Sequence, residues 1–176
     1  MSPHLWLIGA VIAVATTAAH AEVIDAQANG FTVREISTIA AKPARVWQAL
    51  GRLGAWWDPI HTYSGDSTRL SIDLTPGGEW RERLADGGVV HMVVVNAQPG
   101  RLLRLEGALG PLQAFGVVGH LTVTLRPVSG GTEVIQTYDV GGHAPGGLDK
   151  LAAPVDGVLT AQLARLKRYA ETGPAR

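Results

Sequence analysis

Past residue 30 the chain opens with a strand pattern and then a helix pattern. Residues 31–39 alternate apolar and polar side chains, which is typical of a strand with one buried face. Pro43 suits the first turn of a helix, and Val46, Leu50 and Leu53 then follow at three- and four-residue steps. The pattern therefore predicts a short amphipathic helix over 43–53.

Residues 68–140 are composed almost entirely of short strand patterns separated by turns. Glycine, with proline, aspartate or serine, marks the links, which have hairpin length. The predicted strands cover 70–74, 79–85, 89–97, 101–107, 119–127 and 132–140. Short strands joined in this way form an antiparallel meander. Segment 108–116 is apolar, with Gly, Pro and Phe, and fits either a loop or a helical turn.

The last predicted element is a long helix over 148–172, because its apolar residues recur near helical spacing. Pro154 lies inside it and predicts a kink. The glycine-rich segment 141–147 before it lacks the Lys-Ser/Thr of a phosphate-binding loop, so we interpret it as a flexible link. Since no repeat or linker divides the chain, we predict a single domain over 22–176.

The first 21 residues carry no charged side chain. Residues 5–15 are apolar, and Ala19-His20-Ala21 has the small-x-small form that a signal peptidase accepts. The sequence predicts a signal peptide over 1–21, cleavage after Ala21, and export to the periplasm or the medium, with no membrane span left after cleavage. An uncleaved membrane anchor is the alternative.

Composition excludes several kinds of chemistry. The 176 residues contain no cysteine, which removes disulfides, thiol nucleophiles, cysteine zinc sites and iron–sulfur clusters. Basic and acidic side chains balance at 15 each, and there is no Lys/Arg run, which argues against nucleic acid as a partner. His61, His91, His120 and His143 lack metal-site spacing, so neither a metal nor another cofactor is expected. No Gly-x-Ser-x-Gly or Ser-x-x-Lys motif supports nucleophilic hydrolysis.

The order of the elements and four segments within them carry a family resemblance. These segments are Ala41-Lys-Pro-Ala-Arg-Val-Trp-Gln-Ala-Leu50, Gly77-Gly-Glu-Trp80, Gly100-Arg-Leu-Leu-Arg-Leu105 and Val155–Tyr169. Residues 30–171 resemble the START-like, or SRPBCC, superfamily, which includes birch-pollen allergen relatives, polyketide cyclases and Hsp90-ATPase-activator homologues. The resemblance implies an α+β helix-grip fold, in which a curved antiparallel sheet wraps around the long C-terminal helix. It also implies a cavity between sheet and helix that takes apolar ligands.

Successive side chains of a strand point to opposite faces of a sheet, so the pairing across each hairpin predicts which side chains face this cavity. If residues 86–87 or 87–88 form a two-residue loop, Glu82 lies opposite or diagonal to His91. The inner face then holds Trp80, Glu82, Leu84, Val89, His91, Val93 and Val95, and the outer face holds Glu79, Arg81, Arg83, Val90, Met92 and Val94. In the last hairpin, pairing Arg126 with Glu133 places Leu121, Val123, Leu125, Val134, Gln136 and Tyr138 inside, and His120, Thr122, Thr124 and Thr137 outside.

These assignments give a set of candidate site residues. The predicted ligand contacts are Trp57, His61, Tyr63, Trp80, Glu82, His91, Val93, Gln136 and Tyr138. The tryptophans and Tyr63 either cap a ligand or simply pack the helices on the sheet. Glu82 and His91 are either an acid/base pair or a buried ion pair without a chemical role.

Three function classes follow from the candidate site and the resemblance. The leading hypothesis is a carrier, sensor or sequestering protein for a small, largely apolar or aromatic ligand. The alternative is a cyclase, dehydratase or isomerase that uses Glu82 and His91 for proton transfer on a polyketide-like substrate. A protein-interaction module is suggested only by the Hsp90-activator branch, and export argues against it.

Overall fold

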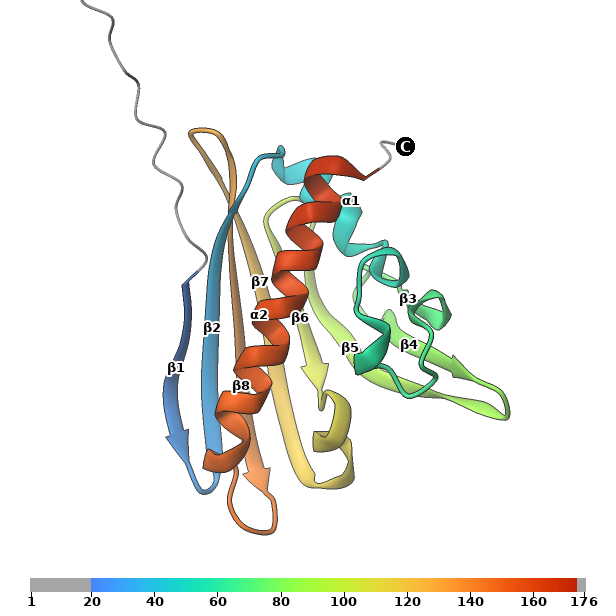
Figure 1. Ribbon diagram of the computed structural model, residues 1–176, viewed down its shortest axis with the longest axis vertical. Coiled ribbons are helices and arrows are strands. Elements are labelled where there is room, and N and C mark those ends of the chain that lie inside the picture. The colour runs from blue at the N-terminus through green and yellow to red at the C-terminus, as the bar shows by residue number, and fades with distance from the viewer. Residues whose placement is uncertain (1–19, 174–176) are drawn as a thin grey trace, which may run out of the picture.

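The computed structural model describes residues 20–173 and contains, within them, one antiparallel sheet and one long helix. The eight strands have the order β1-β2-β8-β7-β6-β5-β4-β3, and the curved sheet wraps around α2 (Figure 1). The helices are α1 (Pro43–Leu50) and α2 (Asp149–Thr172). The strands are β1 (His20–Gln27), β2 (Gly30–Ile39), β3 (Leu70–Ile72), β4 (Glu79–Leu84), β5 (Gly87–Gln98), β6 (Leu102–Gly107), β7 (Gly116–Val128) and β8 (Gly131–His143). The predicted α+β helix-grip fold is confirmed.

The long hairpin β7–β8 has the predicted register. Arg126 pairs with Glu133, and the alternation continues without a shift to Gly116 and His143. The residues predicted to face inward are all buried, whereas His120 and its outward neighbours are exposed or half-buried. Period-two alternation and one tight turn are therefore sufficient to fix this part of the sheet.

The hairpin β4–β5 differs from its predicted register. Glu82 pairs with Val89 across a loop formed by residues 85–86, and the ladder shifts so that Trp80 pairs with Met92. His91 is thus the extra residue of a β-bulge, and both His91 and Met92 are buried. The face prediction beyond the bulge was wrong, because the bulge reverses the alternation. Val94 faces the core, and Val93 and Val95 face outward, with Val95 46% exposed.

Three other boundaries also differ from the expectations. α1 ends at Leu50, and the buried Leu53 lies in a separate 3-10 turn, η1 (Leu53–Ala55). β8 continues through residues 141–143 of the glycine-rich segment expected to be a link. The edge strand β1 was not predicted; it pairs with β2 and overlaps the predicted cleavage position, while residues 1–19 of the predicted signal peptide lie outside the described residues.

The C-terminal end of α2 is held by a side chain from α1. The Arg45 guanidinium donates hydrogen bonds to the carbonyl oxygens of Tyr169, Ala170 and Gly173 at 3.0–3.2 Å. The Tyr169 carbonyl also accepts the Gly173 N–H, whereas other carbonyls at a helix end lack intrahelical partners, and a basic side chain there complements the helix dipole. No helix within residues 20–173 is long and apolar enough to span a bilayer.

Candidate functional site

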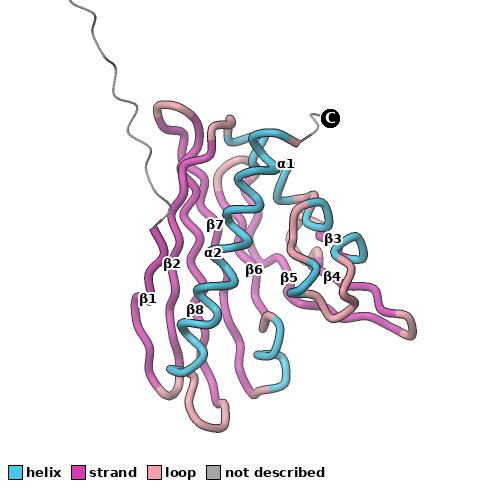
Figure 2. The backbone as a smooth tube through the Cα atoms, in the orientation of Figure 1, coloured by secondary structure: helices cyan, strands magenta, loops and turns pink. Residues whose placement is uncertain are grey.

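A cavity of about 680 Å³ lies between the N-terminal half of α2 and the β3–β5 end of the sheet. The loop between α1 and β3, which carries the 3-10 turns η2 (Pro59–His61) and η3 (Ser67–Arg69), covers one side. The 3-10 turn η4 (Gly110–Ala114), which lies between β6 and β7 along the chain (Figure 2), supplies lining residues on another side. The lining residues are Trp57, Ile60, His61, Thr62, Tyr63, Leu70, Trp80, His91, Leu109, Gly110, Pro111, Leu112, Ala114, Phe115, Leu151, Pro154, Val155, Val158 and Leu159. Most of these side chains are apolar.

Aromatic rings form the wall of the cavity on the sheet side. The rings of Trp57 and Trp80 meet edge to face at 4.8 Å, and the Tyr63 ring stacks on the His91 imidazole at 5.8 Å. The Trp57 indole N–H donates to the carbonyl oxygen of His61 at 3.0 Å, which fixes the ring orientation. Trp56, in contrast, is a core residue whose indole N–H donates to the Ala49 carbonyl oxygen at 2.8 Å. The two adjacent tryptophans therefore have different positions, and only Trp57 lines the cavity.

His91 of this wall forms a buried pair with Glu82, which lies behind it. Glu82 Oε2 is 3.0 Å from His91 Nε2, and Glu82 Oε1 accepts a hydrogen bond from the Ser64 backbone N–H at 2.5 Å. The Glu82 side chain is fully buried, and 6% of the His91 side chain is exposed. The predicted contact between Glu82 and His91 is present, although the β4–β5 hairpin has a different register from the predicted one.

The surroundings of this pair indicate its charge state. Burial raises the pKa of Glu82, but hydrogen bonds from Ser64, Tyr63 and His91 outweigh it, and the net pKa lies below the ordinary value. Burial lowers the pKa of His91 by more than the hydrogen bond and charge of Glu82 raise it. At neutral pH, Glu82 is therefore an acceptor-only carboxylate and His91 is a neutral imidazole. Because the carboxylate cannot donate, the proton of His91 is assigned to Nε2.

The predicted site residues are divided between the cavity wall, the protein core and a second hollow. Trp57, His61, Tyr63, Trp80 and His91 line the cavity, and Glu82 does not line it but bonds the lining residue His91. Gln136 faces the core, where it donates to Glu35 Oε2 at 3.1 Å. Tyr138 is also a core residue; its hydroxyl donates to the Gly107 carbonyl oxygen at 3.2 Å and accepts from the Leu109 N–H at 3.1 Å. Tyr138 thus holds the segment that leads into η4.

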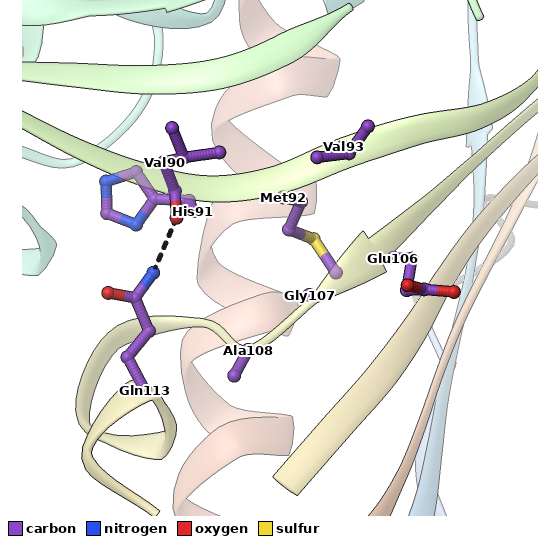
Figure 3. A pocket seen from close by; sticks show the side chains of 8 residues that line it. All are labelled: Val90, His91, Met92, Val93, Glu106, Gly107, Ala108 and Gln113. Atoms are coloured by element: carbon purple, nitrogen blue, oxygen red, sulfur yellow. Dashed lines mark hydrogen bonds between the residues drawn. The ribbon is translucent and has the colours of Figure 1, made fainter. Parts of the chain in front are cut away.

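Val93 does not line the cavity but a second, smaller hollow of about 310 Å³ beside β5 (Figure 3). This hollow opens where the ladder between β5 and β6 ends, at the pair Met92 and Gly107. Beyond that point β5 has no hydrogen bonds from β6. The Gln113 side-chain amide instead donates to the Val90 carbonyl oxygen at 3.0 Å (Figure 3). His91 lines both hollows.

For two walls of the cavity, sequence reasoning named no ligand-contacting residue. One is the η4 region, whose apolar composition had left open whether it was a loop or a turn; an apolar loop with exposed backbone is itself a signal of a binding surface. The other is the N-terminal part of α2: the resemblance places the cavity against this helix, but Leu151, Val155 and Val158 were not among the candidate ligand contacts. Within residues 20–173 there is no cluster of three or more metal-ligating side chains.

The fold and the site together define an α+β protein whose curved sheet grips a C-terminal helix over a mostly apolar cavity. The chain belongs to the family described as polyketide cyclase / dehydrase and lipid transport, which matches residues 30–171.

Solved structures with the same fold share little sequence with this chain. An uncharacterised protein from Rhizobium leguminosarum has a TM-score of 0.60 and 22% identity, over 88% of this chain and 98% of its own. The Aha1 dimer from Colwellia psychrerythraea has a TM-score of 0.58 and 20% identity, over 82% and 98%. CalU16 from Micromonospora echinospora has a TM-score of 0.56 and 12% identity, over 90% and 88%. No curated protein sequence matches the chain.

Proposed function

We propose that this protein binds a small, largely apolar ligand in the cavity between α2 and the β3–β5 end of the sheet, as a carrier, sensor or sequestering protein. The observation that carries the proposal is the cavity itself, about 680 Å³ and lined mainly by aliphatic and aromatic side chains. This volume and lining are typical of small-molecule sites. Apolar burial supplies the driving force, at roughly 25 cal/mol per Å² of ligand surface removed from water.

The proposal is tested with N-phenyl-1-naphthylamine, a neutral apolar dye that fluoresces when it leaves water. We expect saturable binding of one dye per chain. Val158 is half-buried in the cavity wall on α2, so Val158→Trp fills part of the cavity and is expected to weaken binding by roughly tenfold or more. The matched control is Ala164→Trp, which adds the same side chain at an exposed position of the same helix, away from the cavity. Absence of saturable binding, or equal binding by both variants, would refute the proposal.

The second candidate function is proton transfer on a bound substrate, favoured by the Glu82–His91 pair. A neutral imidazole can accept a proton at Nδ1, and an ionised Glu82 at 3.0 Å from Nε2 would stabilise the resulting imidazolium. Once a native ligand is recovered by mass spectrometry from protein purified from its own host, Glu82→Gln and His91→Ala are compared for turnover. A loss of binding without a separate loss of chemistry would reject proton transfer.

We also propose that the protein is exported after cleavage at Ala21. The support is the uncharged apolar segment and the small-x-small sequence that precede Glu22. N-terminal sequencing of the protein from its own host is expected to begin at Glu22. An intact N-terminus in the membrane fraction would instead identify an uncleaved anchor.

A further inference from the structure

Apart from the exposed imidazole of His61, most hydrogen-bonding side chains of the cavity wall are engaged within the protein or covered by it. The hydroxyl of Thr62 donates to the Pro59 carbonyl oxygen at 2.7 Å, and the hydroxyl of Tyr63 donates to the Gly110 carbonyl oxygen at 2.8 Å. The Trp57 indole N–H donates to the His61 carbonyl oxygen. The Trp80 indole N–H has no partner, but it is fully covered by protein and out of a ligand's reach. These side chains therefore offer a ligand apolar surface and little hydrogen bonding.

His91 is different, because only one of its ring nitrogens is engaged. Nε2 bonds Glu82, which is the one side-chain hydrogen bond of His91 among residues 20–173, and Nδ1 is not among the unpartnered polar atoms that the protein covers there. The ring lines the cavity, with the Tyr63 ring stacked on one face and Trp80 close by, at 5.6 Å. The imidazole is held between aromatic rings with one nitrogen available.

The direction of the hydrogen bonds decides what this nitrogen offers. The Ser64 N–H donates to one oxygen of Glu82, and His91 Nε2–H donates to the other. A carboxylate with both oxygens accepting keeps the imidazole proton on Nε2 and leaves a lone pair on Nδ1. The buried part of the wall thus presents one acceptor of fixed orientation, whereas the exposed imidazole of His61 has no side-chain hydrogen bond to orient it among residues 20–173.

We infer that the ligand is an apolar molecule carrying a hydroxyl group, an alcohol or phenol, whose O–H donates to His91 Nδ1. This inference rests on the proposed ligand-binding function and specifies its chemical class. An ether or hydrocarbon of the same shape leaves Nδ1 unpaired, which is unfavourable in a dry site. A carboxylate cannot donate to Nδ1 and would lie near the negative charge of Glu82. The cavity therefore selects neutral hydroxylated ligands over fatty-acid-like anions.

The test uses two probes of nearly the same shape, 2-naphthol and 2-methoxynaphthalene, which differ in whether the oxygen carries a hydrogen. Dissociation constants are measured by equilibrium dialysis for the wild type and for His91→Phe, which keeps an aromatic ring but removes the acceptor. The methyl ether is the more apolar probe. We therefore compare the ratio of the two dissociation constants between wild type and variant. The difference in apolarity between the probes contributes equally to both ratios and cancels.

We expect the preference for 2-naphthol to be roughly three- to tenfold larger in the wild type than in His91→Phe, the effect of one hydrogen bond. A second variant, Glu82→Gln, changes the tautomer while keeping the side-chain shape. The new amide can donate to Nε2, which moves the imidazole proton to Nδ1 and makes it a donor. Both probes have an oxygen that accepts, so the preference is expected to fall in this variant as well.

An unchanged preference in His91→Phe would overturn the assignment of the hydroxyl to His91. Equal ratios in the wild type and both variants would show that the cavity does not recognise the hydroxyl group. Either result leaves the proposed ligand binding intact, since that is tested separately by the dye and the Val158→Trp and Ala164→Trp variants. Circular dichroism of each variant confirms that it is folded before its ratio is used.

Discussion

Glu35 lies on β2 with its side chain turned toward α2 and only 1% exposed. One carboxylate oxygen accepts a hydrogen bond from Gln136 at 3.1 Å, and the other is buried without a partner. Burial is the main cause that raises the pKa of Glu35 from 4.5 to about 7; the Gln136 hydrogen bond opposes it, and the charge of Asp156 on α2 adds to it. The folded protein therefore binds a proton on Glu35 more tightly than the unfolded chain does.

The sign of the pH dependence follows from this difference. Because the folded pKa is raised, the contribution of Glu35 to stability is fully present below about pH 4.5 and is lost as pH rises to about 7. At about 1.36 kcal/mol per pKa unit, the loss is on the order of 3 kcal/mol, a large part of the stability of a typical domain. Glu35→Gln keeps the shape and the contact with Gln136 but has no proton to lose.

The assay is urea unfolding, followed by tryptophan fluorescence, of wild type and Glu35→Gln between pH 4.5 and 8. We expect the variant to be more stable than the wild type by on the order of 3 kcal/mol at pH 8, and the difference to shrink toward pH 4.5. The control Glu133→Gln alters a carboxylate that faces outward on β8 opposite Arg126, and its difference from wild type should vary much less with pH. A difference for Glu35→Gln that does not change with pH would refute the reasoning.

Three further predictions concern the supports of the helix and the cavity. Arg45→Ala removes three hydrogen bonds to the end of α2 and should lower the unfolding free energy by roughly 1–3 kcal/mol in urea titrations; an unchanged midpoint would contradict this. Tyr138→Phe removes the two bonds that hold residues 107–109, so stability should fall by roughly 1–2 kcal/mol and the dye should bind more weakly; unaltered dye binding would show that η4 is held by other contacts. Gly119→Ala places a methyl group 2.5 Å from Cε2 of Tyr138 and should destabilise the protein in thermal unfolding, whereas Gly141→Ala, where the nearest atom is at 4.0 Å, should have little steric effect; equal losses from both changes would argue against a steric cause.

The parts of the fold that the sequence predicts are those that depend on local pattern. The β7–β8 hairpin has uninterrupted alternation and a turn at Ser129-Gly130, so its register and faces follow directly. α2 follows from helical spacing, and its length is correct to within a residue. β1 has neither clear alternation nor flanking turn residues on both sides, and it was missed because its place depends on pairing with β2.

The candidate site was only partly predictable, because its walls come from segments with weak local signals. Residues of η4 and of the first turns of α2 meet the sheet only after folding, and an apolar side chain in a cavity wall has the same pattern as one in a solid core. Gln136 illustrates the converse case. It was correctly predicted to face inward, but its partner is Glu35 in the core rather than the cavity.

The bulge at His91 explains both the failed register and the position of the pair with Glu82. A regular strand turns every second side chain inward, so it cannot bury both His91 and Met92. The extra residue allows Met92 to keep its place in the core while the imidazole turns toward Glu82 and the cavity. The sequence Val-Val-His-Met-Val-Val is compatible with an insertion at several positions, since apolar side chains flank it on both sides. A polar residue that needs a buried partner is therefore a better guide to register here than the apolar pattern.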